Sequence, residues 1–442
     1  MNPKPRLMTG IALAFALIVT GGTAFAKHHP AVFTVQPNGH DDTASLQAAF
    51  DAAVQAGPGS TVQLVKGTYY LSAGIVVTNF DGNFVGAGKD KTVVQNLGVL
   101  PASTVLLTFY AEGDAAKSGL ITISDLTLRA IGPAETDPGF FMGPLNTIDL
   151  LFLMGTGTGQ PDSPPDYLNA SVIRVGFEGQ SGEQYTPWGC NVSNGIDFMT
   201  NGWENLIGNY LFQDCTFKNT HGGVSGVGLQ DSHVMVEGCT FEDVLGPIGM
   251  YGFDHTAFDI RCNRIQNRHI LQPLWSSGVY LMNYMPGSNS VVCVSHNEIS
   301  AQSAVDGIRV EDFGFDPAAG VPTIKHTVIS DNDIFLDGDW SGGIGGAFIS
   351  NVRIVDNTIS GHGRLGIYTG NAESAWWGFQ GDDFTPSASN WVIVGNNLKR
   401  ADTLYSPILL GPNSSHCLVK ADADDVLNLG TDNTIIDVPA KH

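Results

Sequence analysis

Basic side chains are scarce in this chain of 442 residues. Lysine and arginine together number 21 against 43 aspartates and glutamates, which gives a formal net charge of −22 at pH 7. Nucleic acids and anionic membranes are recognised through basic patches, so this charge balance excludes both as partners. An anionic glycan would also be repelled unless Ca²⁺ or a local basic patch intervened.

Long apolar runs are also lacking. The run from Ile11 to Thr20 follows a basic start at Lys4 and Arg6 and precedes small residues up to Ala26. It is shorter than the roughly 20 residues of a membrane span, and the pattern is that of a secretory signal peptide. We therefore predict a signal peptide over residues 1–26, no transmembrane segment, and a secreted or periplasmic protein. No Pro/Ser linker divides residues 27–442, so we expect one domain.

Motifs for metal binding are few. None of the six cysteines forms a Cys-x-x-Cys pair, and no two histidines have metal-ligand spacing, so a zinc site is not supported. Two acidic loop clusters leave Ca²⁺ as a possible cofactor. They are Asp382/Asp383 and Asp422/Asp424/Asp425.

Seven segments repeat one pattern of apolar residues around an Asn or Cys. Apolar residues precede this position by three and, with one Thr, by five, and another follows it by two. Offsets of two place side chains on one face of a strand, and the odd offset marks a corner between strands. The Asn or Cys positions are Cys215, Cys239, Asn263, Asn297, Asn332, Asn357 and Asn396.

Recurrence of the same corner every 24 to 39 residues predicts a solenoid of stacked strands. An inward Asn at each corner can bond backbone groups that the bend leaves unpaired, and the Asn side chains can bond along the stack. Cys215 and Cys239 would lie one coil apart in the same column. At that spacing they can form a disulfide or remain as buried thiols.

The N-terminal segment adds an end cap. Asp41 or Asp42 can begin a helix over about 42–56, whose apolar stripe is Leu46, Ala49, Phe50, Ala53 and Val54. Such a helix would cover the open end of the solenoid. The first coils are predicted from Val62, Leu64, Gly67 and Tyr69, and from Ile121, Ile123, Leu126 and Leu128.

The stretch from Gln36 to Gln95 resembles the entry segment of the pectate-lyase-like superfamily. The resemblance implies a single-stranded right-handed parallel β-helix with an N-terminal capping helix and coils over about 60–438. It also implies carbohydrate binding along one column of strands. The fold hosts lyases, hydrolases, epimerases and non-catalytic proteins, so it does not choose among activities.

A further strand, usually opened by Gly, follows each variable loop. We expect its inward residues to be Val227/Leu229, Ile248/Met250, Val279/Leu281, Ile308/Val310, Ala347/Ile349, Ile367/Thr369 and Ile408/Leu410. The outward positions then align Tyr251, Tyr280, Phe348 and Tyr368 over successive coils, around Arg309 and Glu311. Exposed aromatic rows suit sugar rings. The alternative is that loops cover these rings and make a second, smaller core.

Ionisable residues beside this row suggest chemistry. We predict catalytic roles for Tyr251, Asp254, His255, Arg309 and Glu311, and substrate binding by Tyr280, Phe348, Tyr368, Asp312, His269, His362 and Arg364. A lyase would use a base, an acid and a cation or Ca²⁺. A hydrolase would use two carboxyl groups, for which Asp254 and Glu311 are the candidates.

Two short motifs resemble known enzymes in part. The string at 251–255, YGFDH, is similar to the Tyr-Gly-Phe-Asp-Pro-His motif of mannuronan epimerases but lacks the proline. The GHG at 361–363 is a polygalacturonase motif without its companion motifs. The favoured prediction is an exported lyase acting on a uronate-containing polysaccharide. The alternatives are a non-catalytic glycan-binding or surface protein, a glycoside hydrolase and a uronate epimerase.

Overall fold

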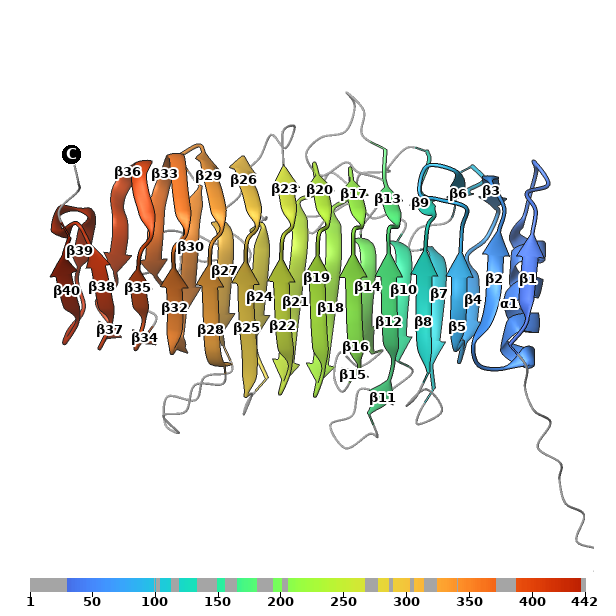
Figure 1. Cartoon of the computed structure of the whole chain (residues 1–442), viewed down its shortest axis with the longest axis horizontal. Helices are drawn as coiled ribbons and strands as arrows, with labels where there is room; N and C mark the ends of the chain where they lie inside the picture. Colours follow the sequence, from blue (N-terminus) through green and yellow to red (C-terminus); the bar gives the residue numbers. More distant parts are fainter. Residues whose placement is uncertain are drawn as a thin grey trace, which may run out of the picture.

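The computed structural model describes most of the chain. The described residues are 30–98, 100, 104–112, 119–132, 149–155, 165–180, 194–200, 206–266, 277–285, 289–302, 306–313, 324–339, 341–370 and 387–438. They form a right-handed parallel β-helix that runs from β1 at one end to β40 at the other (Figure 1). The fold predicted from the repeats is thereby confirmed. The proposed signal peptide lies outside the described residues, and no described helix is long and apolar enough to cross a membrane.

Three faces line the solenoid. The first face is a 14-stranded parallel sheet. Its strands are β1 (Val32–Val35), β2 (Ser60–Leu64), β5 (Gly82–Val85), β8 (Leu120–Ser124), β12 (Asn169–Ile173), β16 (Asn209–Gln213), β19 (His233–Glu237), β22 (Ala257–Arg261), β25 (Ser290–Ser295), β28 (Ile324–Ser330), β32 (Val352–Val355), β35 (Val392–Val394), β38 (Leu418–Ala421) and β40 (Thr434–Asp437).

The second and third faces belong to one 23-stranded sheet. The second face contains β3 (Gly67–Leu71), β6 (Thr92–Asn96), β9 (Thr127–Arg129), β13 (Gly176–Glu178), β17 (Thr216–Lys218), β20 (Thr240–Glu242), β23 (Arg264–Gln266), β26 (Glu298–Gln302) and β29 (Asp333–Asp337). The third face contains β4 (Ile75–Thr78), β7 (Val105–Ala111), β10 (Asp149–Gly155), β14 (Asn194–Thr200), β18 (Gly222–Gln230), β21 (Gly246–Asp254), β24 (Val279–Asn283), β27 (Asp306–Asp312), β30 (Gly342–Ala347) and β39 (Val426–Asn428).

Longer and shorter strands complete these faces. The long strands β33 (Thr358–Thr369) and β36 (Asn397–Leu410) run through both the second and the third face. The short strands are β11 (Asp166–Tyr167), β15 (Leu206–Ile207), β31 (Ile349–Ser350), β34 (Ala388–Ser389) and β37 (Ser414–Ser415), and a 3₁₀ turn, η3, spans Ala423–Asp425.

The corner between the first and second faces has the same construction in successive coils. A residue in the left-handed region precedes each Asn or Cys, as at Cys262 (φ 56°), His296 (φ 57°) and Asp331 (φ 56°). The Asn side chains then bond along the stack: the Asn263 N–H donates to Asn297 Oδ1 at 2.9 Å, and the Asn297 N–H donates to Asn332 Oδ1 at 3.0 Å. Each of these bonds satisfies a backbone amide that the bend would otherwise leave unpaired.

The ladder extends over the whole predicted series of asparagines. Asn332 bonds Asn357, and Asn357 bonds Asn396, in the same manner. At the start of the series the Cys239 N–H donates to Asn263 Oδ1 at 2.9 Å. Cys215 and Cys239 are buried free thiols that donate to backbone carbonyls, so the thiol alternative holds and the disulfide is absent.

Helix α1 (Thr43–Ala56) covers the N-terminal end of the solenoid, beside β1 (Figure 1). Leu46, Phe50 and Ala53 are buried, and the Phe50 ring packs 5.0 Å from that of Phe84. Val54 is 36% exposed, so its assignment to the buried stripe was wrong. Asp42 occupies the N-cap position, although its side chain accepts the N–H groups of Asn38 and Tyr70 rather than a helical N–H.

Glycines form a column where the second face turns into the third. A Cβ on Gly307 would lie 2.7 Å from Ile334, and one on Gly343 would lie 2.8 Å from Ile359. The backbone therefore approaches the core too closely for any side chain at this corner. These glycines begin the third-face strands and set which residues of each strand point outward.

The third-face register agrees with the prediction in five coils and differs in two. Val224, rather than Val227, pairs with Ile248, and Ile344, rather than Ala347, continues the column beyond Ile308. Both segments are therefore shifted by three residues from the predicted alignment. Ala347 lies opposite Glu311, and Phe348 falls just past the end of β30.

Replacing Asn297 by Leu should lower the free energy of unfolding by about 3 kcal/mol or more, because it removes the partner of two buried backbone groups of the preceding coil, the Asn263 N–H and the Ile260 carbonyl. Chemical denaturation would measure the loss. The matched control is Asn209→Leu, which removes an exposed contact between asparagines of neighbouring coils. The control should stay within about 0.5 kcal/mol of wild type. Equal losses in the two variants would contradict a special role for the buried ladder.

Candidate active site at the third face

The outward column of the third face that contains Arg309 is covered. Arg309 is 4% exposed, Glu311 1% and Tyr368 0%. Leu365, Tyr368 and Leu409 pack as a second buried cluster apart from the main core. At Tyr368 the structure therefore matches the alternative expectation, in which the aromatic ring is covered and belongs to a second, smaller core. No face of this ring is available to a sugar.

Arg309 lies at the centre of a buried ionic network. Its Nε donates to Glu311 Oε1 at 2.7 Å, its second terminal nitrogen also contacts Glu311, and its first lies 3.4 Å from Asp306 Oδ2. Two tyrosine hydroxyls complete the network: Tyr280 donates to Glu311 and Tyr368 donates to Asp306, each at 2.6 Å. The guanidinium occupies the space between the two carboxylates, so no sugar oxygen can lie between them.

The network perturbs the ionisation of its members. Burial raises the pKa of Asp306 to about 6, against the opposing effects of Arg309 and of the Tyr368 hydroxyl. Burial likewise raises the pKa of Tyr280, with Glu311 adding to the shift. Burial alone would lower the pKa of Arg309, but Glu311 and the other neighbours raise it well above its usual value. Arg309 therefore stays charged.

Glycines on the outward column make room for tyrosine rings. A Cβ on Gly249 would lie 2.7 Å from the Tyr251 hydroxyl, and one on Gly345 would lie 2.4 Å from Tyr368 Cζ. The Tyr251 ring therefore folds back over Gly249 and contacts Tyr280 edge-on at 5.8 Å. This turns the Tyr251 hydroxyl away from the end of β21, where Asp254 and His255 lie.

Asp197 continues this column towards the N-terminus through Ser225 and Gly249. It is 4% exposed, Asn194 donates to its Oδ2 at 2.8 Å, and its Oδ1 has no hydrogen-bond partner. Burial raises the pKa of Asp197 well above its usual range, and Asp149 adds to the rise. Burial, with Asp197 nearby, also raises the pKa of Tyr251 to about 12.

The exit end of β21 presents a second, more accessible group. His255 Nδ1 lies 2.8 Å from Asp254 Oδ1, and its Nε2 lies 3.2 Å from Asn289 Nδ2. The approach to Asp254 is close, yet Oδ1 accepts no hydrogen bond within the described part of the chain. The Asn289 amide can donate only to an unprotonated Nε2, which places the ring proton on Nδ1 beside Asp254. His255 and Asn289 are exposed.

The structure thus does not bring the five predicted catalytic residues together. Arg309 is in register with Gly249, two coils away, through Tyr280. Two coil spacings amount to about 10 Å, and Asp254 lies five residues further along its strand. Arg309 and Glu311 are therefore separate from Asp254 and His255, while Tyr251 joins the buried group.

The C-terminal ends of the third-face strands form one edge of this face, which we call the exit edge. Three aromatic side chains follow one another along it, directly after β24, β27 and β30. We call Tyr284, Phe313 and Phe348 the aromatic rail. Tyr284 is 39% exposed and Phe313 40% exposed, and the rings of Phe313 and Phe348 lie 5.6 Å apart at 51°. The Tyr284 ring lies over Gly252, where a Cβ would be 2.3 Å from its Cζ. Two of the three rail side chains are thus exposed, and Phe348 is half-buried.

The other predicted substrate-binding residues lie elsewhere or are enclosed. Asp312 is fully buried and accepts the Ile324 N–H at 2.9 Å, so it braces the corner. His362 bridges Asp339 and Asp402, whose hydrogen bonds raise its pKa, and Arg364 lies over the Tyr405 ring. His269 lies outside the described residues.

Metal ligands are not gathered anywhere in the described part of the chain, where no group of three or more His, Cys, Asp or Glu could hold an ion. Asp422 caps the 3₁₀ turn η3 by accepting the Asp424 N–H at 3.1 Å. Burial, Asp422 and Asp424 raise the pKa of Asp425. Asp382 and Asp383 lie outside the described residues.

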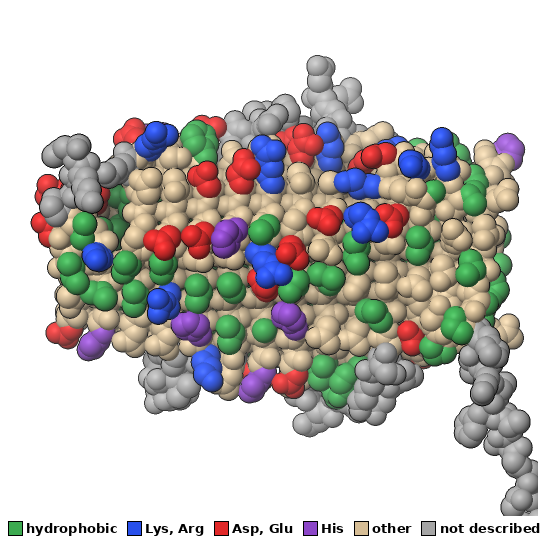
Figure 2. Space-filling model, in the orientation of Figure 1, with side chains coloured by type: hydrophobic (Ala, Val, Ile, Leu, Met, Phe, Trp, Pro, Cys, Tyr) green, Lys and Arg blue, Asp and Glu red, His purple; other side chains and the backbone are tan. Residues whose placement is uncertain are grey.

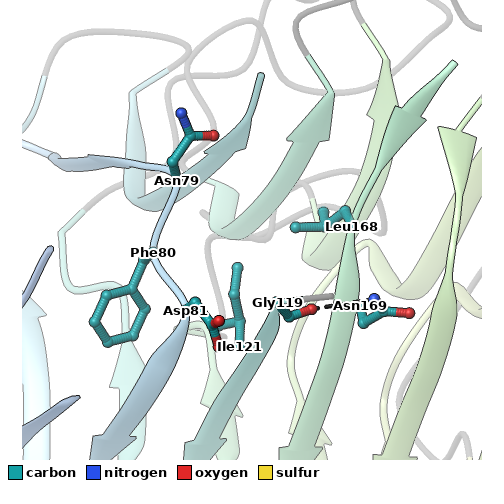
Figure 3. A pocket seen from close by; sticks show the side chains of 7 residues that line it. All are labelled: Asn79, Phe80, Asp81, Gly119, Ile121, Leu168 and Asn169. Atoms are coloured by element: carbon teal, nitrogen blue, oxygen red, sulfur yellow. Dashed lines mark hydrogen bonds between the residues drawn. The ribbon is translucent and has the colours of Figure 1, made fainter. Parts of the chain in front are cut away.

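The first face and a small cavity have fewer features of a functional site than the exit edge. The first face carries apolar side chains among acidic and basic ones (Figure 2), where pairs such as Arg261–Glu237 neutralise each other. A cavity of about 20 Å³ near Asp81 and Asn169 (Figure 3) has room for about one water molecule. Asn169 Nδ2 donates to the Gly119 carbonyl there at 3.1 Å. These polar groups serve the stacking of coils.

Five residues at these sites were not predicted. Asp306 precedes the outward position Arg309 by three residues, and Asp197 occupies an outward position on a strand that was not aligned; no sequence signal marks the burial of either carboxyl group. Asn289, Tyr284 and Phe313 lie beyond strand ends. The aromatic pair Phe313 and Tyr284 could have been found by extending the alignment of β24 and β27 by two residues, since Met282 pairs with Glu311.

No family model matches the sequence, and no curated protein matches it. Solved structures share the fold. The catalytic domain of a GH87 α-1,3-glucanase, solved with tetrasaccharides, has a TM-score of 0.55 and 12% identity over 92% of this chain and 66% of that one. The DFA-IIIase of Arthrobacter chlorophenolicus, solved with GF2, has a TM-score of 0.54 and 12% identity over 95% and 98%. The A-module of the Azotobacter vinelandii mannuronan C-5 epimerase AlgE6 scores 0.48 with 16% identity over 91% and 96%.

These likenesses show the right-handed parallel β-helix fold and nothing more specific. The fold of this chain is thus shared with polysaccharide-active enzymes. At such low identity the position of a site cannot be transferred from one chain to another, so the chemistry has to be argued from the residues described above.

Arg309→Ala should destabilise the protein by about 3–5 kcal/mol, because it leaves two buried carboxylates without their cation. Urea denaturation would measure the loss. Arg264→Ala is the matched control, since Arg264 pairs with Glu298 at an exposed site. Exposed pairs contribute about 0–1 kcal/mol. If Arg309→Ala were as stable as the control, the buried network would not be a structural support.

Asp306→Asn should change how stability depends on pH. The pKa of Asp306 is raised from 3.8 to about 6, so the folded state binds the proton more tightly than the unfolded state. The stability due to this proton is fully present below about pH 4 and is lost as the pH rises to about 6, a change of about 3 kcal/mol. Asp306→Asn lacks this change. Free energies of unfolding measured from pH 4 to 7 should therefore converge or cross, whereas parallel profiles would contradict a raised pKa.

Proposed function

We propose that this protein is an exported polysaccharide-active enzyme that cleaves a uronate-containing glycan by β-elimination at the exit edge of β21. The observation that carries the proposal is the arrangement of His255 between Asp254 and Asn289, in an exposed position beside the aromatic rail. It supplies a base, a group that stabilises the charged base, and a donor for the substrate.

His255 Nε2 is the base. The Asn289 contact leaves this nitrogen unprotonated, and Asp254 Oδ1 lies beside the opposite nitrogen without a hydrogen-bond donor of its own. When Nε2 takes up a proton, the imidazolium is stabilised by this carboxylate, as in other His–Asp pairs. His255 is a corner residue at φ 47°, in a position that Asp231 also occupies at φ 43° one coil earlier, so the regular corner fixes its backbone.

Asn289 is placed to bind the uronate carboxylate. The proton removed in β-elimination lies on the carbon that carries the carboxylate, so a group that binds the carboxylate must lie next to the base. The Asn289 amide lies 3.2 Å from Nε2 and meets this requirement. Its N–H groups would stabilise the negative charge that develops on the carboxylate as the proton leaves.

The reaction is balanced without water. Nε2 takes the proton from the carbon alpha to the carboxylate, the electron pair forms a carbon–carbon double bond, and the bond to the glycosidic oxygen breaks. The leaving oxygen takes a proton from the Tyr284 hydroxyl. This hydroxyl lies over Gly252, and Gly252 precedes His255 by three residues in the sequence. The products are an unsaturated uronate end and a free hydroxyl end.

Export and fold support this proposal. The N-terminal segment has the pattern of a signal peptide, which would bring the enzyme to extracellular polysaccharide. The fold is shared with an α-1,3-glucanase solved with tetrasaccharides. We infer further that the closed network around Arg309 supports the third face and takes no part in the reaction.

A non-catalytic glycan-binding protein is the second candidate. The favouring observation is that Arg309 is already neutralised by Glu311 and Asp306, so this predicted cation does not serve a substrate. Such a protein would bind glycans at the same edge without forming an unsaturated product.

His255→Asn should lower turnover on a uronate polysaccharide by at least ~100-fold, because it removes the base. Ultraviolet absorbance of the unsaturated product measures the rate. Asn keeps the left-handed backbone preference of position 255. His296→Asn, an exposed corner histidine at φ 57°, is the matched control and should retain full activity. Full activity of His255→Asn would contradict the lyase mechanism, and no unsaturated product from any uronate glycan would favour the second candidate.

A further inference from the structure

We propose that the aromatic rail is the binding site for an extended oligosaccharide that runs along the solenoid axis, with sugar rings stacked on Tyr284, Phe313 and Phe348 and one end beside His255. The proposal deepens the proposed function and rests on it only for the direction of the chain. Stacking on the rail is a separate property that can be measured without catalysis.

The three rings form a row because they follow equivalent strands. Met282, Glu311 and Ala347 are consecutive partners on β24, β27 and β30, and each rail residue comes one or two positions after them. The Phe313 N–H donates to the Asn283 carbonyl at 2.7 Å, which holds neighbouring coils together at the rail. Two coil spacings separate the first ring from the third, about 10 Å.

The backbone beneath the rail holds its rings in place. Gly252 leaves room for the Tyr284 ring against the preceding coil, and Phe348, which has a left-handed backbone at φ 58°, places its ring 5.6 Å from that of Phe313. Asp312 and Asn283, which immediately precede two of the rings, are fully buried and contact each other at 3.3 Å. A site that is ordered before binding loses little conformational entropy on binding.

The exposed area fits a sugar chain better than a protein partner. An aromatic side chain has about 150–250 Å² of surface, so Tyr284 and Phe313, each about 40% exposed, together offer roughly 120–200 Å², and the half-buried Phe348 adds less than either. A stable protein interface needs about 800 Å² on each partner. The C–H faces of a few sugar rings would cover the rail, and aromatic faces suit such contacts.

The rail is continuous with polar groups that could bind sugar hydroxyls. The Tyr284 ring lies over Gly252 of β21, the strand that ends at Asp254, and Asn289 comes five residues after Tyr284. An apolar strip bordered by hydrogen-bonding groups is the usual composition of a sugar site, whereas a lipid or an apolar peptide would leave these groups unpaired. The geometry thus points to a glycan.

The test measures binding by isothermal titration calorimetry with galacturonate, mannuronate and neutral glucan oligosaccharides. Phe313→Leu and Phe348→Asn remove the two rings that take no part in the proposed chemistry, and Asn suits the left-handed backbone at 348. Phe335→Ala is the matched control, because Phe335 is 48% exposed on the second face, away from the rail. Thermal unfolding would verify that each variant is folded.

We expect each rail variant to weaken oligosaccharide binding about 3–10-fold, the range of one stacking contact, and the control to bind as wild type does. His255→Asn should keep its binding. Wild-type affinity in both rail variants would overturn the rail, and so would failure of the wild-type protein to bind any of the oligosaccharides.

The two proposals fail in different ways. If binding depends on the rail but no uronate glycan yields an unsaturated product, the lyase is wrong and the rail stands. If the product forms and the rail variants keep the wild-type KM, the rail is wrong and the lyase stands. Loss of both binding and folding in Phe348→Asn would leave Phe313→Leu to decide, because Phe313 lies in the ordinary backbone region.

Discussion

The backbone amide at the corner between the first and second faces is the constraint on which the rest of the structure depends. Each coil must bend sharply there, and the bend leaves an N–H in the interior with no strand partner. Asn solves this by accepting that N–H from the previous coil while its own amide donates to carbonyls. Because every coil turns at the same place, residues at equal offsets from the corner form columns. The rail and the buried network are both consequences of these columns.

The network around Arg309 and the group formed by Asp254 and His255 at the exit edge differ in their surroundings. Around Arg309 each charge has a partner, the hydroxyls of Tyr280 and Tyr368 are bonded, and Arg309, its two carboxylates and Tyr368 have almost no exposed surface. A buried pair of this kind is costly to break, so it suits a support. At the exit edge, by contrast, His255 is exposed and Asp254 Oδ1 lacks a hydrogen-bond donor. Catalysis needs groups whose interactions become stronger only in the transition state, and such groups are found at the edge.

The sequence could predict the parts of the fold in which apolar residues alternate strictly. The Asn ladder, the capping helix and the first- and second-face strands that flank the ladder from Tyr210 onward have such patterns, and their apolar positions were predicted, apart from Val54. The third face was predicted less well, because β18 and β30 begin with paired glycines that carry no side chain to indicate the register. A shift of three residues there displaced Phe348 from the strand. Tyr284, Phe313 and Asn289 follow strand ends, where periodicity gives no signal.

We propose that substrate lies on the exit edge and not over the centre of the third face. The most direct measurement is a crystal structure of the His255→Asn variant with a uronate oligosaccharide bound. The account predicts sugar rings stacked on Phe313 and Phe348, with a carboxylate within hydrogen-bonding distance of the Asn289 amide. An oligosaccharide bound against Arg309 and Glu311, with their network opened to receive it, would contradict the account.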